Sequence, residues 1–179
     1  MAGRFVFTID LGTSGPKVAL FSLDGDYVDG DFTPVDLVLV GTHGVEQRPD
    51  DWWGGIVSAS ERLWARVDAD PADVAAVSVT SQWSGTVPVD ADGNHLHNAV
   101  IWMDARGAEQ TKALVGGRVR VSGYEPRKLR RWISLTGGAP AHSGKDPISH
   151  ILWIEDQLHE VAAATATYLE PKDYLNLRL

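Results

Sequence analysis

Residues 5–21, FVFTIDLGTSGPKVALF, constrain the fold of this chain more than any other stretch. Two runs of β-favouring residues flank a tight segment, Leu11–Gly15, which contains two glycines and two hydroxyl side chains. Apolar runs joined by about 3–5 residues that include glycine are typical of a β-hairpin. The sequence therefore predicts that the chain opens with two antiparallel strands around this turn.

The predicted turn carries groups that suit a phosphate. Glycines let backbone N–H groups face an anion, the hydroxyls of Thr13 and Ser14 add donors, and Lys17 adds positive charge. Asp10, which ends the first run, offers the oxygen ligands that Mg²⁺ prefers. The spacing differs from the G-x-x-x-x-G-K-[ST] of a P-loop, and no helical pattern follows. The alternative is an ordinary hairpin in which Thr13 and Ser14 bond their own turn.

Composition limits the class of protein. A chain of 179 residues with 44% hydrophobic and 22% charged residues suits a globular domain with a core. It has no cysteine, which excludes disulfides and thiol chemistry. The net charge of −8, without a long basic run, argues against nucleic acid or an anionic membrane as partner. The sequence shows no signal peptide and no apolar run near ~18 residues, which indicates a cytoplasmic protein.

Hydrophobic periodicity predicts alternating strands and helices along the rest of the chain. Strands are expected at 27–28, 35–40, 74–80, 86–89, 99–102 and 166–169, with a loop over 43–47. Helices are expected over 52–64 with Asp50 as N-cap, over 104–115, within 123–138, after Asp146-Pro147 and from Pro171. The continuous apolar run at 74–80 predicts a strand covered on both faces. Trp52, Trp53 and Trp64 repeat at helical spacing, which favours a core stripe over a sugar platform.

Two polar segments follow predicted strands and suit a polyol. In SQWSG, Gln82 and Ser84 can exchange hydrogen bonds with hydroxyl groups, and Trp83 offers an apolar wall. The alternative for this segment is a hairpin turn with an incidental tryptophan. Beyond the strand that ends at Trp102, the Asp104 carboxylate can accept from vicinal hydroxyls and the Arg106 guanidinium can donate. The alternative is that Asp104 only caps the following helix.

Four blocks in order, DLGTSGPK, SQWSG, NAVIWMDAR and PKDYLNLRL, resemble the FGGY family of carbohydrate kinases over residues 5–179, most nearly its xylulokinase-like branch. The resemblance implies an α/β, actin-like ATPase (ribonuclease H-like) domain with a mixed sheet flanked by helices. Residues 1–179 would form most of the N-terminal domain, with its remainder and the C-terminal domain absent. The implied transferase moves the γ-phosphoryl of ATP, with Mg²⁺, to a hydroxyl of a ketopentose (xylulose-like) or related polyol.

The resemblance also implies roles for single residues. The family's first phosphate motif, which contacts ATP phosphates and Mg²⁺, is matched by Asp10, Gly12, Thr13, Ser14 and Lys17, with Asp10 as the metal-binding residue. The substrate-binding segments are matched by Gln82, Trp83, Ser84, Trp102, Asp104 and Arg106. Trp83-Ser84 stands where xylulokinases usually have Met-His, which leaves xylulose itself open as the substrate. The family's catalytic Asp lies beyond Leu179, so the resemblance places no catalytic residue here and predicts that this piece alone is inactive.

Two other hypotheses fit parts of the sequence. One is a non-catalytic module that binds sugar or nucleotide, or a folded remnant, because no catalytic base is matched. The other is a different actin-like ATPase, which shares the hairpin but does not account for the two polar segments. Surfaces that a missing half would cover also predict that the isolated chain self-associates, as a homodimer or less regularly.

Overall fold

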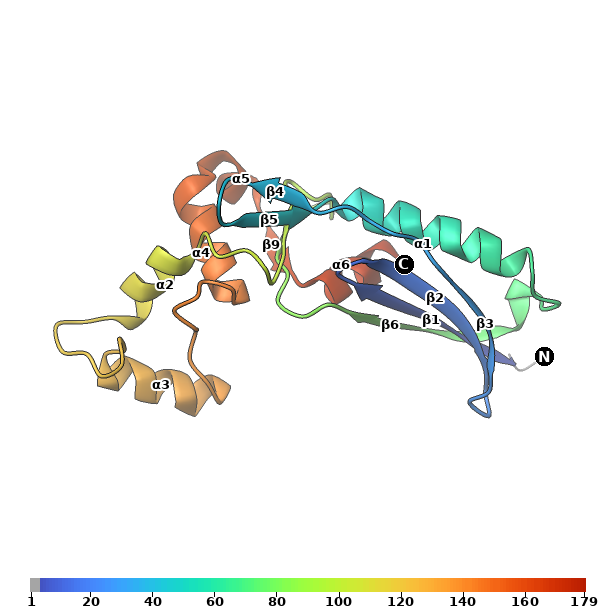
Figure 1. Ribbon diagram of the computed structural model, residues 1–179, viewed down its shortest axis with the longest axis horizontal. Coiled ribbons are helices and arrows are strands. Elements are labelled where there is room, and N and C mark those ends of the chain that lie inside the picture. The colour runs from blue at the N-terminus through green and yellow to red at the C-terminus, as the bar shows by residue number, and fades with distance from the viewer. Residues whose placement is uncertain (1–3) are drawn as a thin grey trace. The chain divides into compact units, whose positions relative to one another are not determined.

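The computed structural model describes residues 4–179, which form two compact units (Figure 1). Unit 1 contains residues 4–37, Gln47–Trp83 and Pro171–Leu179. Unit 2 contains Val38–Glu46 and Ser84–Glu170. Each unit is therefore built from segments that are far apart in the sequence.

Unit 1 contains a mixed four-stranded sheet with the order β3-β2-β1-β6. Its strands are β1 (Phe5–Gly12), β2 (Gly15–Ser22), β3 (Tyr27–Phe32) and β6 (Val74–Ser81). β1 pairs antiparallel with β2 and parallel with β6. The predicted opening hairpin is thus confirmed, and the sheet is of the predicted mixed type.

One face of this sheet is apolar because side chains alternate along a strand. Phe7, Ile9 and Leu11 of β1 are buried, and helix α1 (Pro49–Trp64) packs against β2 and β3. Trp52 in α1 is fully buried, which confirms the core interpretation for this tryptophan, whereas Trp53 and Trp64 are only half-buried. The remaining helices of unit 1 are α6 (Pro171–Arg178) and a short 3₁₀ turn, η1 (Pro71–Asp73).

Two predictions for unit 1 were wrong. α1 begins at Pro49 with Arg48 as its N-cap, and Asp50 lies within the first turn. A proline at the first helical position is already pre-set for the helix, which moves the start ahead of Asp50. β6 is not covered on both faces: most of its residues are exposed, including Val77. β6 is an edge strand of the four-stranded sheet, and edge strands are less fully covered.

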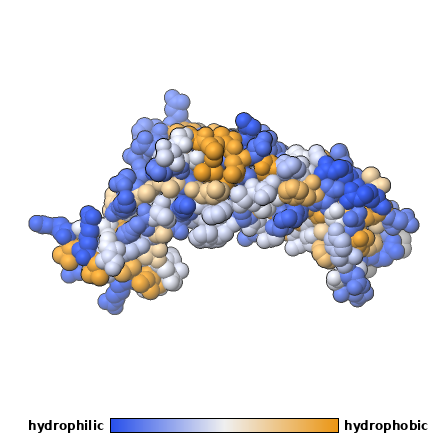
Figure 2. All heavy atoms as spheres, in the orientation of Figure 1, coloured by the Kyte–Doolittle hydropathy of each residue, from blue (hydrophilic) through white to orange (hydrophobic). Residues whose placement is uncertain are grey.

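Unit 2 contains two small sheets. The first has the order β4-β5-β8 and contains β4 (Val38–Val40), β5 (Gly44–Gln47, which ends one residue past the unit boundary) and β8 (Ala99–Val100). The second pairs β7 (Val87–Val89) antiparallel with β9 (Thr167–Leu169). Figure 2 shows an apolar patch over β4, where Leu39 is exposed.

Four helices complete unit 2: α2 (Ala108–Val115), α3 (Pro126–Thr136), α4 (Pro147–Gln157) and α5 (His159–Ala164). α2 packs against α4, and α4 against α5. The predicted α3 and α4 are confirmed, and Asp146 is the N-cap of α4. Among residues 4–179, no helix is both long enough and apolar enough to span a bilayer.

Three other predictions for unit 2 were wrong. Residues 43–47, predicted as a loop, contain β5, because the short segment gains its ladder partners from β4 and β8. The strand predicted at 35–40 forms only over its last three residues. Asp104 does not cap α2, which begins at Ala108 after Gly107.

Candidate functional site

The hairpin turn is tighter than predicted. Gly12 and Gly15 are paired across the ladder, so only Thr13 and Ser14 connect the strands. Gly15 has a φ of +135°, which side chains rarely allow. A Cβ at this position would lie 2.1 Å from the backbone oxygen of Thr33. Close packing of the backbone therefore requires a glycine at the end of the turn.

Asp10 and Lys17 are direct cross-strand partners beside this turn. Lys17 Nζ lies 3.5 Å from Asp10 Oδ2, and their side chains are 59% and 50% exposed. An exposed pair of this kind is held weakly and can rearrange around a ligand. At the turn, the ammonium of Lys17 is thus available to an anion, and the carboxylate of Asp10 to the cation that accompanies it.

A closed set of hydrogen bonds joins this turn to the SQWSG segment. Thr13 Oγ1 donates to Gln82 Oε1 at 3.1 Å, and Gln82 Nε2 donates to Gln47 Oε1 at 2.7 Å. Gln47 Nε2 in turn donates to the carbonyl of Thr13 at 2.8 Å. The fully buried Trp52 also donates through Nε1 to Gln47 Oε1 at 3.2 Å. The hydroxyl of Thr13 therefore bonds a different strand segment and not only its own turn.

The parallel pairing of β1 and β6 explains this contact. Carboxyl ends of parallel strands meet at the same edge of a sheet. The backbone N–H of Gln82 donates to the carbonyl of Leu11 at 2.6 Å, which extends the ladder to the mouth of the turn. The hairpin alternative for SQWSG is wrong, because β6 pairs with β1 while β7 pairs with β9. Trp83 in this connection is 68% exposed.

Ser84 is the first of the candidate residues that belong to unit 2. It is fully buried, its φ is 58°, and its hydroxyl donates to the carbonyl of Lys145 at 2.6 Å. A left-handed conformation in a residue other than glycine is uncommon and is often found at functional sites. The hydroxyl predicted to meet a substrate is thus used to hold the chain segment that precedes α4.

Asp104 and Arg106 form a buried ion cluster with Glu46. Arg106 Nε donates to Asp104 Oδ2 at 2.8 Å, and Arg106 Nη2 donates to Glu46 Oε1 at 2.6 Å. Asp104 Oδ2 also accepts from the backbone N–H of Val45 at 2.8 Å. The guanidinium carbon lies 3.7 Å from the ring centroid of Trp153, a cation–π contact.

This cluster limits the hydrogen bonds that Asp104 and Arg106 can offer to a ligand. Asp104 is 1% exposed, and its lone pairs already accept from protein donors. Of the three predicted residues in this segment, Trp102 is the one with a large exposed surface, at 41%. The ion cluster fixes the backbone on which Trp102 stands. A direct contact of Asp104 or Arg106 with a polyol stays a prediction.

Sequence reasoning missed Gln47 and Glu46. Both are almost completely buried polar residues in the short β5, within the segment predicted as a loop. Their partners lie far along the chain, at Gln82 and Arg106 respectively. The signal in the sequence was two adjacent polar residues just before the start of α1. Polar residues at such a place are equally typical of an exposed loop, so the pattern alone does not identify them as buried.

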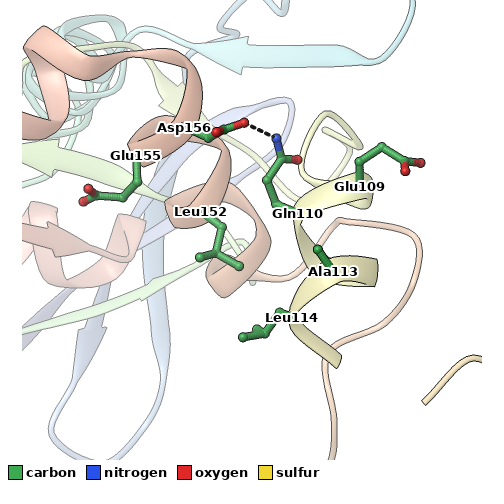
Figure 3. Close-up of a pocket in the computed structure, with 7 residues that line it drawn as sticks. All are labelled: Glu109, Gln110, Ala113, Leu114, Leu152, Glu155 and Asp156. Atoms are coloured by element: carbon green, nitrogen blue, oxygen red, sulfur yellow. Dashed lines mark hydrogen bonds between the residues drawn. The ribbon is translucent and has the colours of Figure 1, made fainter. Parts of the chain in front are cut away.

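Two other features bear on ligands. An open pocket between α2 and α4 is lined by Glu109, Gln110, Ala113, Leu114, Leu152, Glu155 and Asp156, and Gln110 Nε2 donates to Asp156 across it (Figure 3). Its charged lining residues are all acidic, which does not suit a phosphate. Within residues 4–179, no group of three or more acidic or histidine side chains could hold a metal ion by itself.

The candidate residues thus divide between the two units. Unit 1 contains Asp10, Gly12, Thr13, Ser14, Lys17, Gln82 and Trp83, and unit 2 contains Ser84, Trp102, Asp104 and Arg106. The mixed sheet flanked by helices is the actin-like ATPase fold of solved sugar kinases. A xylulose kinase from Rhodospirillum rubrum superposes with a TM-score of 0.81 at 23% identity, over 98% of this chain and 34% of that one.

Sequence comparison extends the likeness from fold to family. Residues 5–179 match the N-terminal domain of the FGGY family of carbohydrate kinases, and the chain belongs to this family. It is 27% identical to a xylulose kinase of Bacillus subtilis over 98% of this chain and 33% of that protein. It is 30% identical to a glycerol kinase of Chromobacterium violaceum over 61% of this chain and 22% of that protein. The chain thus spans about a third of the length of the xylulose kinases that it matches.

Proposed function

We propose that this chain supplies the first phosphate motif and part of the sugar site of an ATP-dependent carbohydrate kinase. The reaction transfers the γ-phosphoryl of ATP to a hydroxyl of a ketopentose, xylulose-like, or of a related polyol. Residues 1–179 then form most of the N-terminal domain of a longer enzyme. The supporting observation is the hydrogen bond between Thr13 and Gln82, which joins the phosphate-type turn to the sugar-type segment in one unit.

The hairpin turn is proposed to bind the terminal phosphates. Catalysis of phosphoryl transfer depends mainly on positioning and on neutralising charge. Lys17 supplies a mobile positive charge, and the backbone and hydroxyls of Thr13 and Ser14 supply donors. The ammonium of Lys17 lies 3.7 Å from the point where a Cβ of Gly12 would stand. Because Gly12 has no side chain, the space beside the lysine is open to an anion.

The proposed cofactor is MgATP. Mg²⁺ is commonly bound through one or two carboxylates together with water and substrate phosphates. The half-exposed carboxylate of Asp10 beside the turn fits one such ligand. Bound Mg²⁺ would offset the charge of the transferring phosphoryl group. The base that removes the hydroxyl proton is proposed to lie outside these 179 residues.

Candidate sugar contacts are proposed in each unit separately: the indole ring of Trp83 and the amide of Gln82 in unit 1, and the indole ring of Trp102 in unit 2. Trp83 and Trp102 offer apolar faces against which the C–H side of a sugar can pack. Gln82 offers an amide that can exchange hydrogen bonds with hydroxyls. A small-molecule polyol fits this mixture of apolar wall and amide better than an acidic or a purely apolar substrate does.

The test is a coupled ADP-release assay on the full-length kinase, with xylulose, other ketopentoses and glycerol as acceptors. We expect saturable, Mg²⁺-dependent turnover with at least one ketopentose, and its loss in Lys17→Ala. The 179-residue chain should show no turnover. No ADP release above the acceptor-free rate with any of these acceptors would overturn the proposal. Sugar binding by calorimetry without turnover would instead favour a binding module.

A further inference from the structure

We infer that His150 is a positioning residue for the sugar end of this site. It holds together two segments of unit 2: the serine segment (Ser84–Thr86) and the tryptophan segment (Trp102–Arg106). This role rests on the proposed function, because the tryptophan segment carries Trp102, which is proposed to contact sugar. His150 itself is completely buried in α4 and would touch neither sugar nor nucleotide.

Thr86 is the contact on the serine segment. Its Oγ1 lies 3.2 Å from His150 Nδ1, and both side chains are buried. Thr86 also exchanges two backbone hydrogen bonds with Val100, at 2.8 and 3.0 Å, in an antiparallel bridge. Val100 ends β8 and leads directly into the tryptophan segment. A side chain that fixes Thr86 therefore also fixes β8, the strand that leads toward Trp102.

Asp104 is the neighbour on the tryptophan segment. Burial lowers the pKa of His150 to about 4, and the negative charge of nearby Asp104 only partly opposes this shift. The ring is therefore neutral near pH 7, with one nitrogen that donates and one that accepts. A neutral ring can either donate a hydrogen bond to the Thr86 hydroxyl or accept one from it. It also adds no second positive charge near Arg106.

The start of α4 braces the same two segments. The carbonyl of Lys145 accepts from the hydroxyl of Ser84 at 2.6 Å. A Cβ built on Gly107, which follows the tryptophan segment, would lie 2.2 Å from the carbonyl oxygen of Ser149. The backbone beyond Arg106 thus packs directly on α4. His150 follows Ser149 in α4, so the side chain that meets Thr86 stands next to the residue on which Gly107 packs.

The second nitrogen of the His150 ring, Nε2, differs from Nδ1 in its hydrogen bonding. His150 Nε2 is buried and has no hydrogen-bond partner among residues 4–179. An unsatisfied buried polar atom costs free energy, so a histidine chosen for stability alone would be a poor choice at this position. The cost is consistent with a residue retained for the geometry that it imposes on Thr86 and Asp104.

The test uses the full-length kinase and removes single atoms. Thr86→Val deletes the hydroxyl that meets the ring, and Thr86→Ser keeps it. Tyr168→Phe is the matched control, because its hydroxyl donates to Glu155 of the same helix α4 at 2.6 Å, and neither residue belongs to the two segments. Each variant is measured for kcat, for KM of sugar and of ATP separately, and for thermal unfolding.

We expect Thr86→Val to raise the KM for sugar by about 5- to 10-fold, as the loss of one buried hydrogen bond would. The KM for ATP should stay within about twofold, and Thr86→Ser should resemble the wild type. Tyr168→Phe should leave both KM values unchanged. His150→Leu should reproduce the effect of Thr86→Val, and His150→Asn, which keeps a polar atom near Nδ1, should restore part of the affinity.

Two results would overturn the role of His150 in an active kinase. One is a sugar KM that Thr86→Val does not change. The other is a sugar KM that rises equally in Tyr168→Phe, which would indicate general loosening of α4. A wild-type enzyme that phosphorylates no ketopentose or polyol would overturn the proposed function and this role together.

Discussion

The hydroxyl of Thr13 donates a 3.1 Å hydrogen bond to the side-chain oxygen of Gln82, across 69 residues of sequence. The contact exists because β1 and β6 run parallel and end at the same sheet edge. It couples a turn that suits phosphate to a segment that suits sugar. A ligand that moves Gln82 must therefore also change the hydrogen bonding of Thr13.

Replacing Gln47 should loosen this edge of unit 1. Gln47→Leu leaves Gln82 Nε2, Trp52 Nε1 and the Thr13 carbonyl without their present partner. Unsatisfied buried polar groups cost about 1–3 kcal/mol each, so we expect a loss of unfolding free energy of at least that size. Urea unfolding followed by tryptophan fluorescence measures it. The exposed Gln157→Leu serves as control and should change stability by less than about 0.5 kcal/mol.

The two glycines of the turn should respond differently to alanine. At Gly15, a Cβ would clash with the Thr33 carbonyl at a φ of +135°, so Gly15→Ala should destabilise unit 1 by more than about 3 kcal/mol. At Gly12, the nearest atoms would lie 3.7 Å away, so Gly12→Ala should fold normally.

The Gly12 variant then isolates the role in binding. In the full-length kinase, Gly12→Ala should raise the KM for ATP by about tenfold, because a methyl group keeps the phosphates from the backbone and from Lys17. Thermal unfolding confirms that the variant folds. An unchanged KM for ATP in a stable Gly12→Ala enzyme would contradict phosphate binding at this turn.

The sequence predicts the elements of this site better than their contacts. The opening hairpin and the core stripe with Trp52 follow from local periodicity, which a window of residues contains in full. Gln47 and Glu46 were missed because their partners are set by parallel pairing and by the short β5, neither of which leaves a local pattern. The start of α1 was misplaced because Pro49 and Asp50 both carry start signals, and sequence alone does not rank them.

The roles of Asp104 and Arg106 show the same limit. A carboxylate and a guanidinium two residues apart suit a polyol, and the prediction followed from that chemistry. Whether such groups face a ligand or one another depends on Glu46, which lies about 60 residues away and completes the ion cluster. Burial of charged side chains is a tertiary property that the spacing does not contain.

Removing Arg106 should therefore destabilise the protein before it affects any sugar contact. Arg106→Met leaves the carboxylates of Asp104 and Glu46 buried without a cation. Breaking a buried pair from one side costs about 3–5 kcal/mol. The surface pair Lys112–Glu109 is the control, and Lys112→Met should cost less than about 1 kcal/mol. Equal unfolding free energies for the two variants would contradict a structural role of the cluster.

Acid should weaken the fold through His150. Its pKa of about 4 in the folded chain lies below the ordinary value near 6.5, so the unfolded chain binds more protons between these values. This contribution to stability is complete above pH ~6.5, falls by up to about 3 kcal/mol toward pH ~4, and changes no further below it. His150→Asn should remove that part of the pH dependence in urea unfolding at pH 7 and 4.5, whereas the exposed His159→Asn should not. Identical slopes for wild type and His150→Asn would show that the buried ring does not resist protonation.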